Sequence, residues 1–333
     1  TLEGCTIGSW VDGGGESGAA EDLGYIYDSN TNTYTVYNAD GLLNVAELVN
    51  GGKTDINITL TADIDLTGKD WTPIGTDYDN SYKGTFDGGG HTITGLTFTT
   101  NDEFAGLFGW LNRAGTVKNV VMEGVQITSN QIYGGSIGGV VGSGWGTIEN
   151  CSVSGSVSGT VYVGGVVGVQ IGGSITGCSS SATVKGTVDV GGVAGQTNSS
   201  ATLTACYATG NVTIEIAPKK NIAGGGLVGM NAGSSLLACY ATGNVTSTGS
   251  STGYVHIGGF LGNNYANVMT ACYWKNNHEQ GIGYNKKSTE ATKVDGTGVT
   301  WKNAVDAMNT ALQNAGSKWR YELKGALPTL RKQ

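Results

Sequence analysis

The most regular feature of the chain is a glycine, preceded by Gly or Ala and followed by two apolar residues and another glycine. This pattern occurs six times, with its first invariant glycine at residues 106, 139, 165, 192, 226 and 259. The intervals are 33, 26, 27, 34 and 33 residues. Self-similarity at such a period is typical of solenoids and repeat arrays. A phosphate-binding loop is needed once per ligand, so six copies indicate architecture rather than a nucleotide site.

A second pattern fixes the register of the repeats. In each one, an apolar residue stands three positions before another, and the second is usually cysteine. From there, apolar or small residues alternate with polar ones, as in Cys151, Val153, Gly155 and Val157. Alternation with period two predicts a β-strand that packs against a narrow interior. The second members of the pairs form a predicted inward ladder of Val120, Cys151, Cys178, Cys206, Cys239 and Cys272.

Together the patterns predict an all-β chain folded as a parallel β-helix, a solenoid with coils of about 25–33 residues. Propeller blades need longer repeats, and leucine-rich repeats need a helix or their own leucine spacing. Stacking the coils at about 4.8 Å pairs every strand edge except those at the two ends. Crossover chirality favours the right-handed form.

The two apolar residues after each glycine pair do not fit simple alternation. In Gly164-Gly165-Val166-Val167, alternation alone sends the two valines to opposite faces of a strand. Either a glycine bend turns both side chains inward, or the outer face is covered by other residues. The sequence leaves both alternatives open.

The two ends differ from the repeats and predict small α/β caps. The predicted units are an N-terminal cap at 1–55, the β-helix at 56–275 and a C-terminal cap at 276–333. The first cap contains a hairpin over 24–37 and a short helix that begins after Asn38 or Asp40. The second contains a helix that begins after Thr300, then a closing strand in which Trp319, Tyr321 and Leu323 alternate.

These residues resemble a known family. Gly106-Leu107-Phe108-Gly109 fits the GLUG motif, and the later copies are variants of it. The segments 60–66 ("LTADIDL"), 71–75 ("WTPIG"), 84–88 ("GTFDG") and 91–93 ("HTI") are similar to the region that precedes such repeats in bacterial surface proteins. The resemblance covers about residues 38–275. It implies a secreted or cell-surface bacterial protein with a role in adhesion.

Some proteins with GLUG repeats are immunoglobulin-cleaving metallopeptidases, and these carry a zinc motif. Such a peptidase needs two histidines four positions apart on a helix, with a glutamate between them. The one His-Glu pair is His278-Glu279, and position 282 is Ile. The peptidase motif is therefore missing from this chain.

Charge is distributed unevenly. The net charge of −8 is the sum of −14 over residues 1–103, +1 over 104–270 and +5 over 271–333. An acidic chain without a basic stripe is a poor nucleic-acid binder. No stretch of these residues approaches 18 consecutive apolar positions, so we expect no membrane span. A start at Thr1-Leu2-Glu3 suggests a processed or trimmed chain.

Cysteine and acidic residues are the candidates for metal chemistry. Zinc sites favour Cys-x-x-Cys pairs, which are missing, so the ladder predicts free, buried thiols and no cofactor. Cys5 lies outside the ladder. In the N-terminal part, Asp63 and Asp65 share a strand face, and three further aspartates lie in predicted loops. Calcium binding there is an alternative to solvated loop acids. The three loop aspartates are Asp77, Asp79 and Asp87.

We therefore predict a non-enzymatic adhesion module that contacts a host or cell-surface protein or glycan along its flank. The alternative is a carbohydrate-active β-helix enzyme, either a polysaccharide lyase or a glycoside hydrolase, supported by fold analogy alone. The repeat body offers roughly one acid per coil, in different registers, which is unlike a catalytic carboxylate pair. Aromatic side chains suited to stacking on a glycan are Tyr133, Trp145, Tyr162, Tyr254 and Tyr265.

Overall fold

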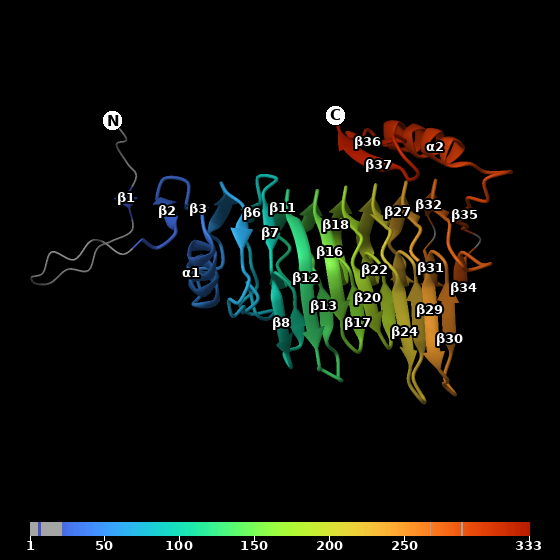
Figure 1. The fold of residues 1–333 in the computed structure, drawn as a ribbon, viewed down its shortest axis with the longest axis horizontal. Coiled ribbons are helices and arrows are strands. Elements are labelled where there is room, and N and C mark those ends of the chain that lie inside the picture. The colour runs from blue at the N-terminus through green and yellow to red at the C-terminus, as the bar shows by residue number, and fades with distance from the viewer. Residues whose placement is uncertain (1–5, 8–21, 267, 288) are drawn as a thin grey trace, which may run out of the picture.

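The protein is a parallel β-solenoid of about seven turns, as a computed structural model of residues 6–7, 22–266, 268–287 and 289–333 shows (Figure 1). Its coils stack along the long axis, and three sheets run along the body. The fold class predicted from the repeats is confirmed. The right-handed sense stays a prediction.

Sheet A holds sixteen of the described strands, and all of its coil-to-coil pairs are parallel. Its strands are β1 (Thr6–Ile7), β2 (Tyr25–Asp28), β3 (Thr33–Val36), β4 (Asn57–Leu60), β6 (Thr85–Asp87), β10 (Phe108–Leu111), β11 (Thr116–Lys118), β14 (Val141–Gly144), β15 (Thr147–Glu149), β18 (Val167–Thr176), β22 (Ala194–Thr204), β26 (Val228–Ala232), β27 (Ser235–Leu237), β31 (Leu261–Asn264), β32 (Met269–Thr270) and β34 (Ile282–Asn285).

Two further sheets complete each coil. Sheet B consists of β5 (Ile64–Asp65), β7 (Thr92–Thr94), β8 (Thr97–Thr100), β12 (Val121–Ser129), β16 (Ser152–Ser158), β19 (Ser179–Ser180), β20 (Thr183–Gly186), β23 (Tyr207–Ala208), β24 (Val212–Ile216), β28 (Tyr240–Ala241), β29 (Val245–Gly249), β33 (Tyr273–Trp274) and β35 (Thr292–Lys293). Sheet C consists of β9 (Phe104–Ala105), β13 (Ser136–Gly138), β17 (Tyr162–Gly164), β21 (Asp189–Gly191), β25 (Ile222–Gly225) and β30 (Val255–Gly258).

The turn from sheet A to sheet B explains why two inward residues stand three positions apart. The residue before each cysteine of the ladder has a left-handed backbone, with φ between 51° and 65°. This single residue turns the chain. The sheet A strand ends just after Ile148, the sheet B strand begins just after Cys151, and both side chains are buried. Alanine at three of these turns accepts a strain of roughly 1–2 kcal/mol each. The left-handed residues are Asn150, Gly177, Ala205, Ala238 and Ala271.

A buried polar column runs through the interior of sheet A. Gly144, Gln170, Thr197, Asn231 and Asn264 occupy one register on successive coils. The Asn231 side-chain amide donates to the backbone oxygen of Ser234 and to Asn264 Oδ1, both at 3.2 Å. Buried amides are stable only when hydrogen-bonded, so this column holds neighbouring coils in one register. No single residue type marks this column in the sequence, because its first four members differ from coil to coil.

The N-terminal end is closed as the sequence predicts. Strands β2 and β3 form an antiparallel hairpin, and β3 pairs in parallel with β4, so the hairpin extends sheet A. Helix α1 (Ala39–Asn50) begins after Asn38, whose side chain accepts a hydrogen bond from the backbone of Gly41. Its buried face joins the main core, which shields the first coil.

The coils continue beyond residue 275, where the sequence placed the start of the C-terminal cap. Strand β34 pairs with β31, and β35 pairs with β33. This last, incomplete coil lacks both the glycine pattern and the cysteine, so the repeat pattern of the sequence ends before the stack does.

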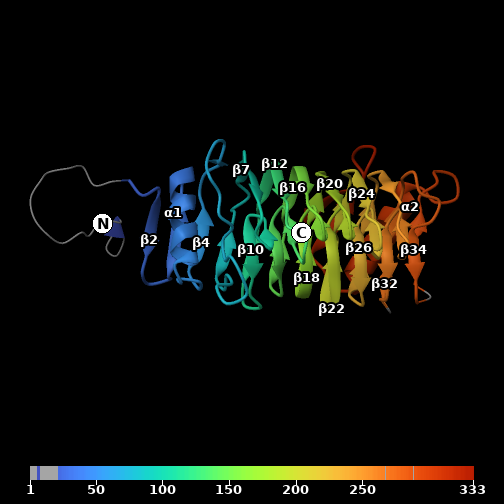
Figure 2. The same ribbon diagram turned by 90° about the horizontal axis from the view of Figure 1, so that it is seen from below.

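The C-terminal unit folds back along the flank of the solenoid. It contains α2 (Trp301–Asn314), which begins at Thr300 as predicted, and an antiparallel pair, β36 (Trp319–Glu322) and β37 (Thr329–Lys332). Strand β36 thus pairs with β37 and not with the last coil. In both views the C-terminus lies near the middle of the body (Figures 1 and 2), and Lys332 forms an ion pair of 2.6 Å with Glu149.

This unit covers the left-handed turns. It forms a second apolar core with outward residues of the solenoid, including Tyr240, which is completely buried. The Tyr321 hydroxyl donates to the backbone oxygen of Ala238 at 2.9 Å. A Cβ at Gly177 would lie 2.2 Å from the Trp319 ring, so this turn requires glycine. The sequence carries a signal for this cover that was missed. Tyrosine follows the ladder cysteine at 207, 240 and 273, whereas serine follows Cys151 and Cys178.

Candidate functional site

The glycine pattern forms the corner between sheets C and A. Strand β17 ends at Gly164 and β18 begins at Val167, and both Val166 and Val167 are fully buried. A Cβ at Gly165 would lie 2.1 Å from Ser180 Oγ and 2.2 Å from a backbone oxygen of the next coil. The chain therefore bends at the glycines and turns both valines inward, which decides between the two alternatives left open by the sequence.

Two columns of side chains meet at this corner, buried in part and half-buried in part. Their buried middle members are Ser136, Ser143, Val169, Asp189 and Ala223, and their half-buried ones are Tyr162, Gln196, Met230 and Asn263. The sheet C column contains Phe104, Ser136, Tyr162, Asp189, Ala223 and His256. The sheet A column contains Trp110, Ser143, Val169, Gln196, Met230, Asn263 and Tyr284. The rings of Phe104 and Trp110 lie 4.5 Å apart, and those of His256 and Tyr284 lie 4.8 Å apart. The two columns therefore contact each other across the corner, and we call them together the corner stripe.

The N-terminal end of the corner stripe is an aromatic cluster. Trp110 contacts Phe104, Tyr78 and Trp145, with ring centroids 4.5, 5.9 and 5.5 Å away, and Tyr78 also contacts Trp145 at 5.6 Å. Tyr78 is 60% exposed. The indole Nε1 of Trp110 is buried and has no hydrogen-bond partner among the described residues. The cluster thus presents aromatic faces and one unused donor.

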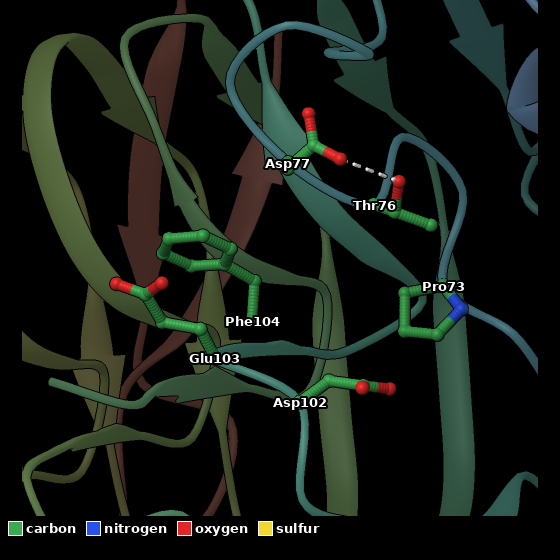
Figure 3. A pocket seen from close by; sticks show the side chains of 6 residues that line it. All are labelled: Pro73, Thr76, Asp77, Asp102, Glu103 and Phe104. Carbon is green, nitrogen blue, oxygen red and sulfur yellow. Dashed lines mark hydrogen bonds between the residues drawn. The ribbon is translucent and has the colours of Figure 1, made fainter. Parts of the chain in front are cut away.

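A pocket of about 310 Å³ adjoins this cluster (Figure 3). It is lined by Pro73, Thr76, Asp77, Asp102, Glu103 and Phe104. Asp77 accepts hydrogen bonds from the backbone of Asn80 and from the Thr76 hydroxyl, which lower the pKa of its carboxyl group. The pocket therefore offers carboxylate oxygens beside aromatic rings.

Asp189 stands in the middle of the corner stripe without a partner. It is 6% exposed, and no described residue donates a hydrogen bond or a positive charge to its carboxyl group. Burial raises its pKa to about 7. A carboxyl group in such surroundings is held partly protonated at neutral pH.

The five aromatic residues predicted to contact a glycan lie in different parts of the structure. Trp145 belongs to the N-terminal cluster, and half-buried Tyr162 lies at the centre of the stripe. Tyr254 and Tyr265 lie at the C-terminal end of the stripe, near His256 and Tyr284. Tyr133 is 77% exposed in the turn between β12 and β13 and contacts no other described aromatic ring. Tyr78, Phe104, Trp110 and Tyr284 were missed, because their contacts join different coils or sheets.

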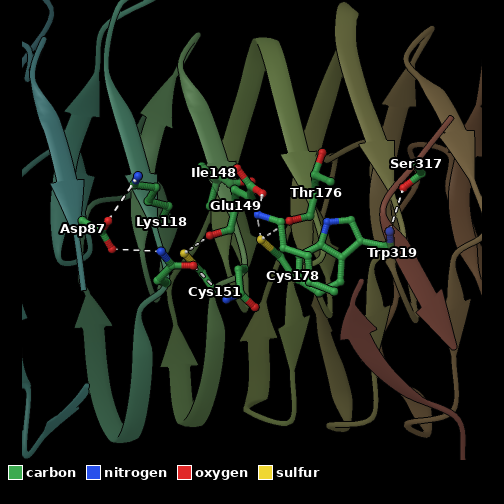
Figure 4. A network of polar contacts seen from close by, with 12 residues as sticks. Asp87, Lys118, Ile148, Glu149, Cys151, Thr176, Cys178, Ser317 and Trp319 are labelled. Carbon is green, nitrogen blue, oxygen red and sulfur yellow. Dashed lines mark hydrogen bonds and ion pairs between the residues drawn. The ribbon is translucent and has the colours of Figure 1, made fainter. Parts of the chain in front are cut away.

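All five cysteines of the ladder are buried, and Figure 4 shows two of them, Cys151 and Cys178. The Cys178 thiol donates to the backbone oxygens of Ile148 at 3.5 Å and Thr176 at 3.4 Å, and the other ladder thiols repeat this arrangement. Burial raises the pKa of the Cys151, Cys206 and Cys272 thiols. The five ladder cysteines are free in the structure. Cys5 lies outside the described residues.

We expect the ladder thiols to resist alkylation in the native protein. A buried thiol with a raised pKa forms little thiolate, which is the reactive species. Alkylation without reductant should label at most Cys5 before unfolding and five or more thiols after it, as counted by mass spectrometry. Rapid native labelling of the ladder, or loss of thiols to disulfides, would contradict the packing.

The aspartates considered as calcium ligands form hydrogen bonds or ion pairs with nearby residues. The Asp63 carboxylate accepts a hydrogen bond from the backbone N–H of Thr92, and the Asp65 carboxylate accepts one from the backbone N–H of Thr67. Asp87 forms an ion pair with Lys118 and a hydrogen bond with Asn119, also shown in Figure 4. Within the described ranges, no three His, Cys, Asp or Glu residues lie close enough to hold a metal ion. The alternative of a calcium site at Asp77, Asp79 and Asp87 therefore gains no support from the described residues.

The fold and its repeats define a parallel β-solenoid that carries GLUG motifs. The model of "The GLUG motif" matches residues 133–158 and 159–185, which confirms the resemblance seen in the sequence. Each match covers one coil, including a glycine corner. Within the described ranges, no helix is long and apolar enough to cross a membrane.

Two relatives are similar over part of the chain. Halomucin of Haloquadratum walsbyi is 33% identical over 158 residues, which are 44% of this chain and 2% of that protein. A "Putative Gly-rich membrane protein" of Evansella cellulosilytica is 34% identical over 128 residues, which are 37% of this chain and 14% of that protein. The chain thus spans only a small part of either relative.

A solved structure has the same fold over most of its length. It is a crystal structure of a "putative immunoglobulin A1 protease" from Bacteroides ovatus, with a TM-score of 0.68. The match covers 90% of this chain and 92% of the other, at 20% sequence identity. At this identity the likeness concerns the fold alone.

Proposed function

We propose that the protein is a non-enzymatic, surface-associated binding module that recognises a host or cell-surface glycan. The observation that carries the proposal is the aromatic cluster of Tyr78, Phe104, Trp110 and Trp145 beside the acidic pocket. Surface association is supported by the GLUG motif and by the name of one relative as a membrane protein.

The chemistry of the cluster suits a neutral sugar. Aromatic faces stack on the C–H faces of sugar rings, and aromatic side chains provide large contact area at fixed geometry. The carboxylates of Asp77, Asp102 and Glu103, which line the pocket beside the cluster, can accept hydrogen bonds from sugar hydroxyl groups. The same carboxylates repel sialic and uronic acids, because like charges raise the energy of a complex.

A binding test follows directly from the cluster. On an array of neutral and acidic glycans, we expect binding to neutral ones. Trp145→Ala and Tyr78→Ala should each weaken binding at least about tenfold, equivalent to about 1.4 kcal/mol for the loss of a central aromatic contact. Tyr133→Ala is the matched control, since it removes an exposed tyrosine outside the cluster. Binding only to proteins, or equal effects of all three changes, would refute the proposal.

The acidic pocket is the one feature that favours the second candidate, a glycoside hydrolase. Such an enzyme needs a carboxylic acid with a raised pKa next to a second carboxylate. The pKa of Asp77 is lowered, because the backbone of Asn80 donates to its carboxylate. Asp77 therefore lacks the protonated state that a general acid requires at neutral pH.

We expect no turnover of polysaccharides or immunoglobulins. Incubation with neutral and acidic polysaccharides should release no new reducing ends and no unsaturated sugars. Immunoglobulin chains should remain intact on electrophoresis. Turnover that is abolished by Asp77→Asn or Glu103→Gln would show instead that the pocket is catalytic.

A further inference from the structure

A second aromatic group lies on the same stripe, at the C-terminal end of the solenoid. The His256 ring stacks between Tyr254 and Tyr284, with centroids at 5.9 and 4.8 Å. Tyr265 lies 6.0 Å from Tyr284, and the Lys286 ammonium lies 5.6 Å from the Tyr265 ring. Tyr254 is 72% exposed and Tyr284 is 40% exposed, so both offer open surface.

The two aromatic groups are aligned by the strand register. Phe104 and His256 stand at opposite ends of the sheet C column, five ladder steps apart. At about 4.8 Å per step, this separation is about 24 Å. Strands β13, β17 and β30 follow one another along the long axis of the body (Figure 1), with β21 and β25 between β17 and β30. A linear molecule along the corner would contact both groups.

Unused polar atoms are concentrated on the stripe. Five buried side-chain nitrogen or oxygen atoms have no partner among the described residues, and three of them belong to Trp110, His256 and Asn263. The unpartnered Asp189 carboxyl group lies between them. An unpaired buried polar group costs about 1–3 kcal/mol, and these groups are covered in the free protein. The polar side chains between the two aromatic groups that a surface ligand can reach are the half-buried Tyr162, Gln196 and Asn263.

The backbone disfavours an extended peptide as the ligand. Peptides that lie along a sheet normally pair with the free edge of a strand. Strands β13, β17, β21 and β25 are each paired on both sides within sheet C, so their edges are occupied. Recognition along the corner therefore depends on side chains, with aromatic faces at both ends and hydrogen-bonding groups between them. A neutral, linear polysaccharide has the matching chemistry.

We propose that the corner stripe and the aromatic residues at its two ends form one continuous binding site for a linear neutral polysaccharide. The end residues are Tyr78 and Trp145 at one end and Tyr254 at the other. This inference rests on the proposed function and adds the length and direction of the ligand. The sugar chain lies parallel to the solenoid axis, stacks on aromatic rings at both ends and hydrogen-bonds to the polar side chains between them.

The test compares short and long sugars by titration calorimetry. The probes are disaccharides and hexasaccharides of β-1,4-linked N-acetylglucosamine and β-1,4-linked glucose. We expect the better hexasaccharide to bind at least about tenfold tighter than its disaccharide, because it also reaches the C-terminal group. Tyr284→Ala and Tyr254→Ala should reduce hexasaccharide affinity and leave disaccharide affinity unchanged.

Tyr284→Phe keeps the stacking face and should retain the wild-type affinity for the hexasaccharide. Equal affinities of disaccharide and hexasaccharide, or Tyr284→Ala with no effect on the hexasaccharide, would overturn the continuous site and leave the N-terminal site standing. If neither length binds, both the proposed function and this inference are refuted. Unchanged melting temperatures of the variants exclude loss of folding as the cause.

Discussion

Val167→Asp should lower the free energy of unfolding by more than about 4 kcal/mol, because it places a charged group in the stacked core. Val167 is fully buried and stands between Val141 and Ala194 in the register of sheet A. An aspartate there has apolar neighbours on both adjacent coils. Urea denaturation followed by circular dichroism measures the effect, and the variant should unfold at a far lower urea concentration or fail to fold.

The matched control is Gln126→Asp. Gln126 is exposed on β12 of sheet B, so the same carboxylate remains in water there. We expect a change within about 1 kcal/mol, as for surface substitutions in general. Similar denaturation midpoints for the two variants would mean that the inward and outward faces are assigned incorrectly.

Asp189→Asn should remove a pH dependence of stability. The folded protein holds the Asp189 proton up to a pKa of about 7, whereas the group has a value of 3.8 in the unfolded chain. A raised pKa in the folded state stabilises the fold at low pH, and this contribution is lost as pH rises from about 4 to about 7. The loss amounts to about 4 kcal/mol, at 1.36 kcal/mol per pKa unit.

The variant has no proton to lose, so its stability should lack this decline. At pH 8 we expect it to unfold at higher urea concentration than the wild type, and at pH 3 the two should be similar. Asp65→Asn is the control, because hydrogen bonds from Thr67 lower the pKa of this exposed carboxyl group and give the opposite slope. Parallel stability curves for wild type and Asp189→Asn would show that Asp189 is paired or exposed.

The coil was predictable from the sequence because its signals recur. The cysteine register and the glycine pairs appear in coil after coil, so a single ambiguous position is corrected by the others. The bends themselves were harder to derive. The spacing of three between Ile148 and Cys151 reflects a left-handed Asn150, and this conformation is not visible in the residue type.

The corner stripe was only half visible in the sequence. The register that holds Tyr162, Asp189 and His256 was expected to face outward, but in the structure the corner buries three of its members. These are Ser136, Asp189 and Ala223. Its partner column on sheet A was not found, because the angle of the glycine bend decides which outward faces meet. Contacts such as Tyr78 with Trp145 also join residues from separate coils, which no local pattern reveals.

The position of the C-terminal unit was the largest difference from expectation. The sequence showed its helix and the alternation of Trp319 with Tyr321, but an open stack suggested a lid over the last coil. The apolar turns Ala205 and Ala238 and the outward Tyr240 offered a larger surface to cover along the flank. Burial of that surface explains why the unit lies there.

Hydroxyl-radical footprinting with mass spectrometry tests the central claim most directly, since it reports which side chains a bound glycan covers. The comparison is the protein alone against the protein saturated with the better-binding hexasaccharide. We predict protection of Tyr78, Trp145, Tyr254 and Tyr284 and no change at Tyr133. Protection of Tyr133 without the corner residues, or unchanged oxidation at all of them in the bound state, would contradict a glycan site along the corner of the solenoid.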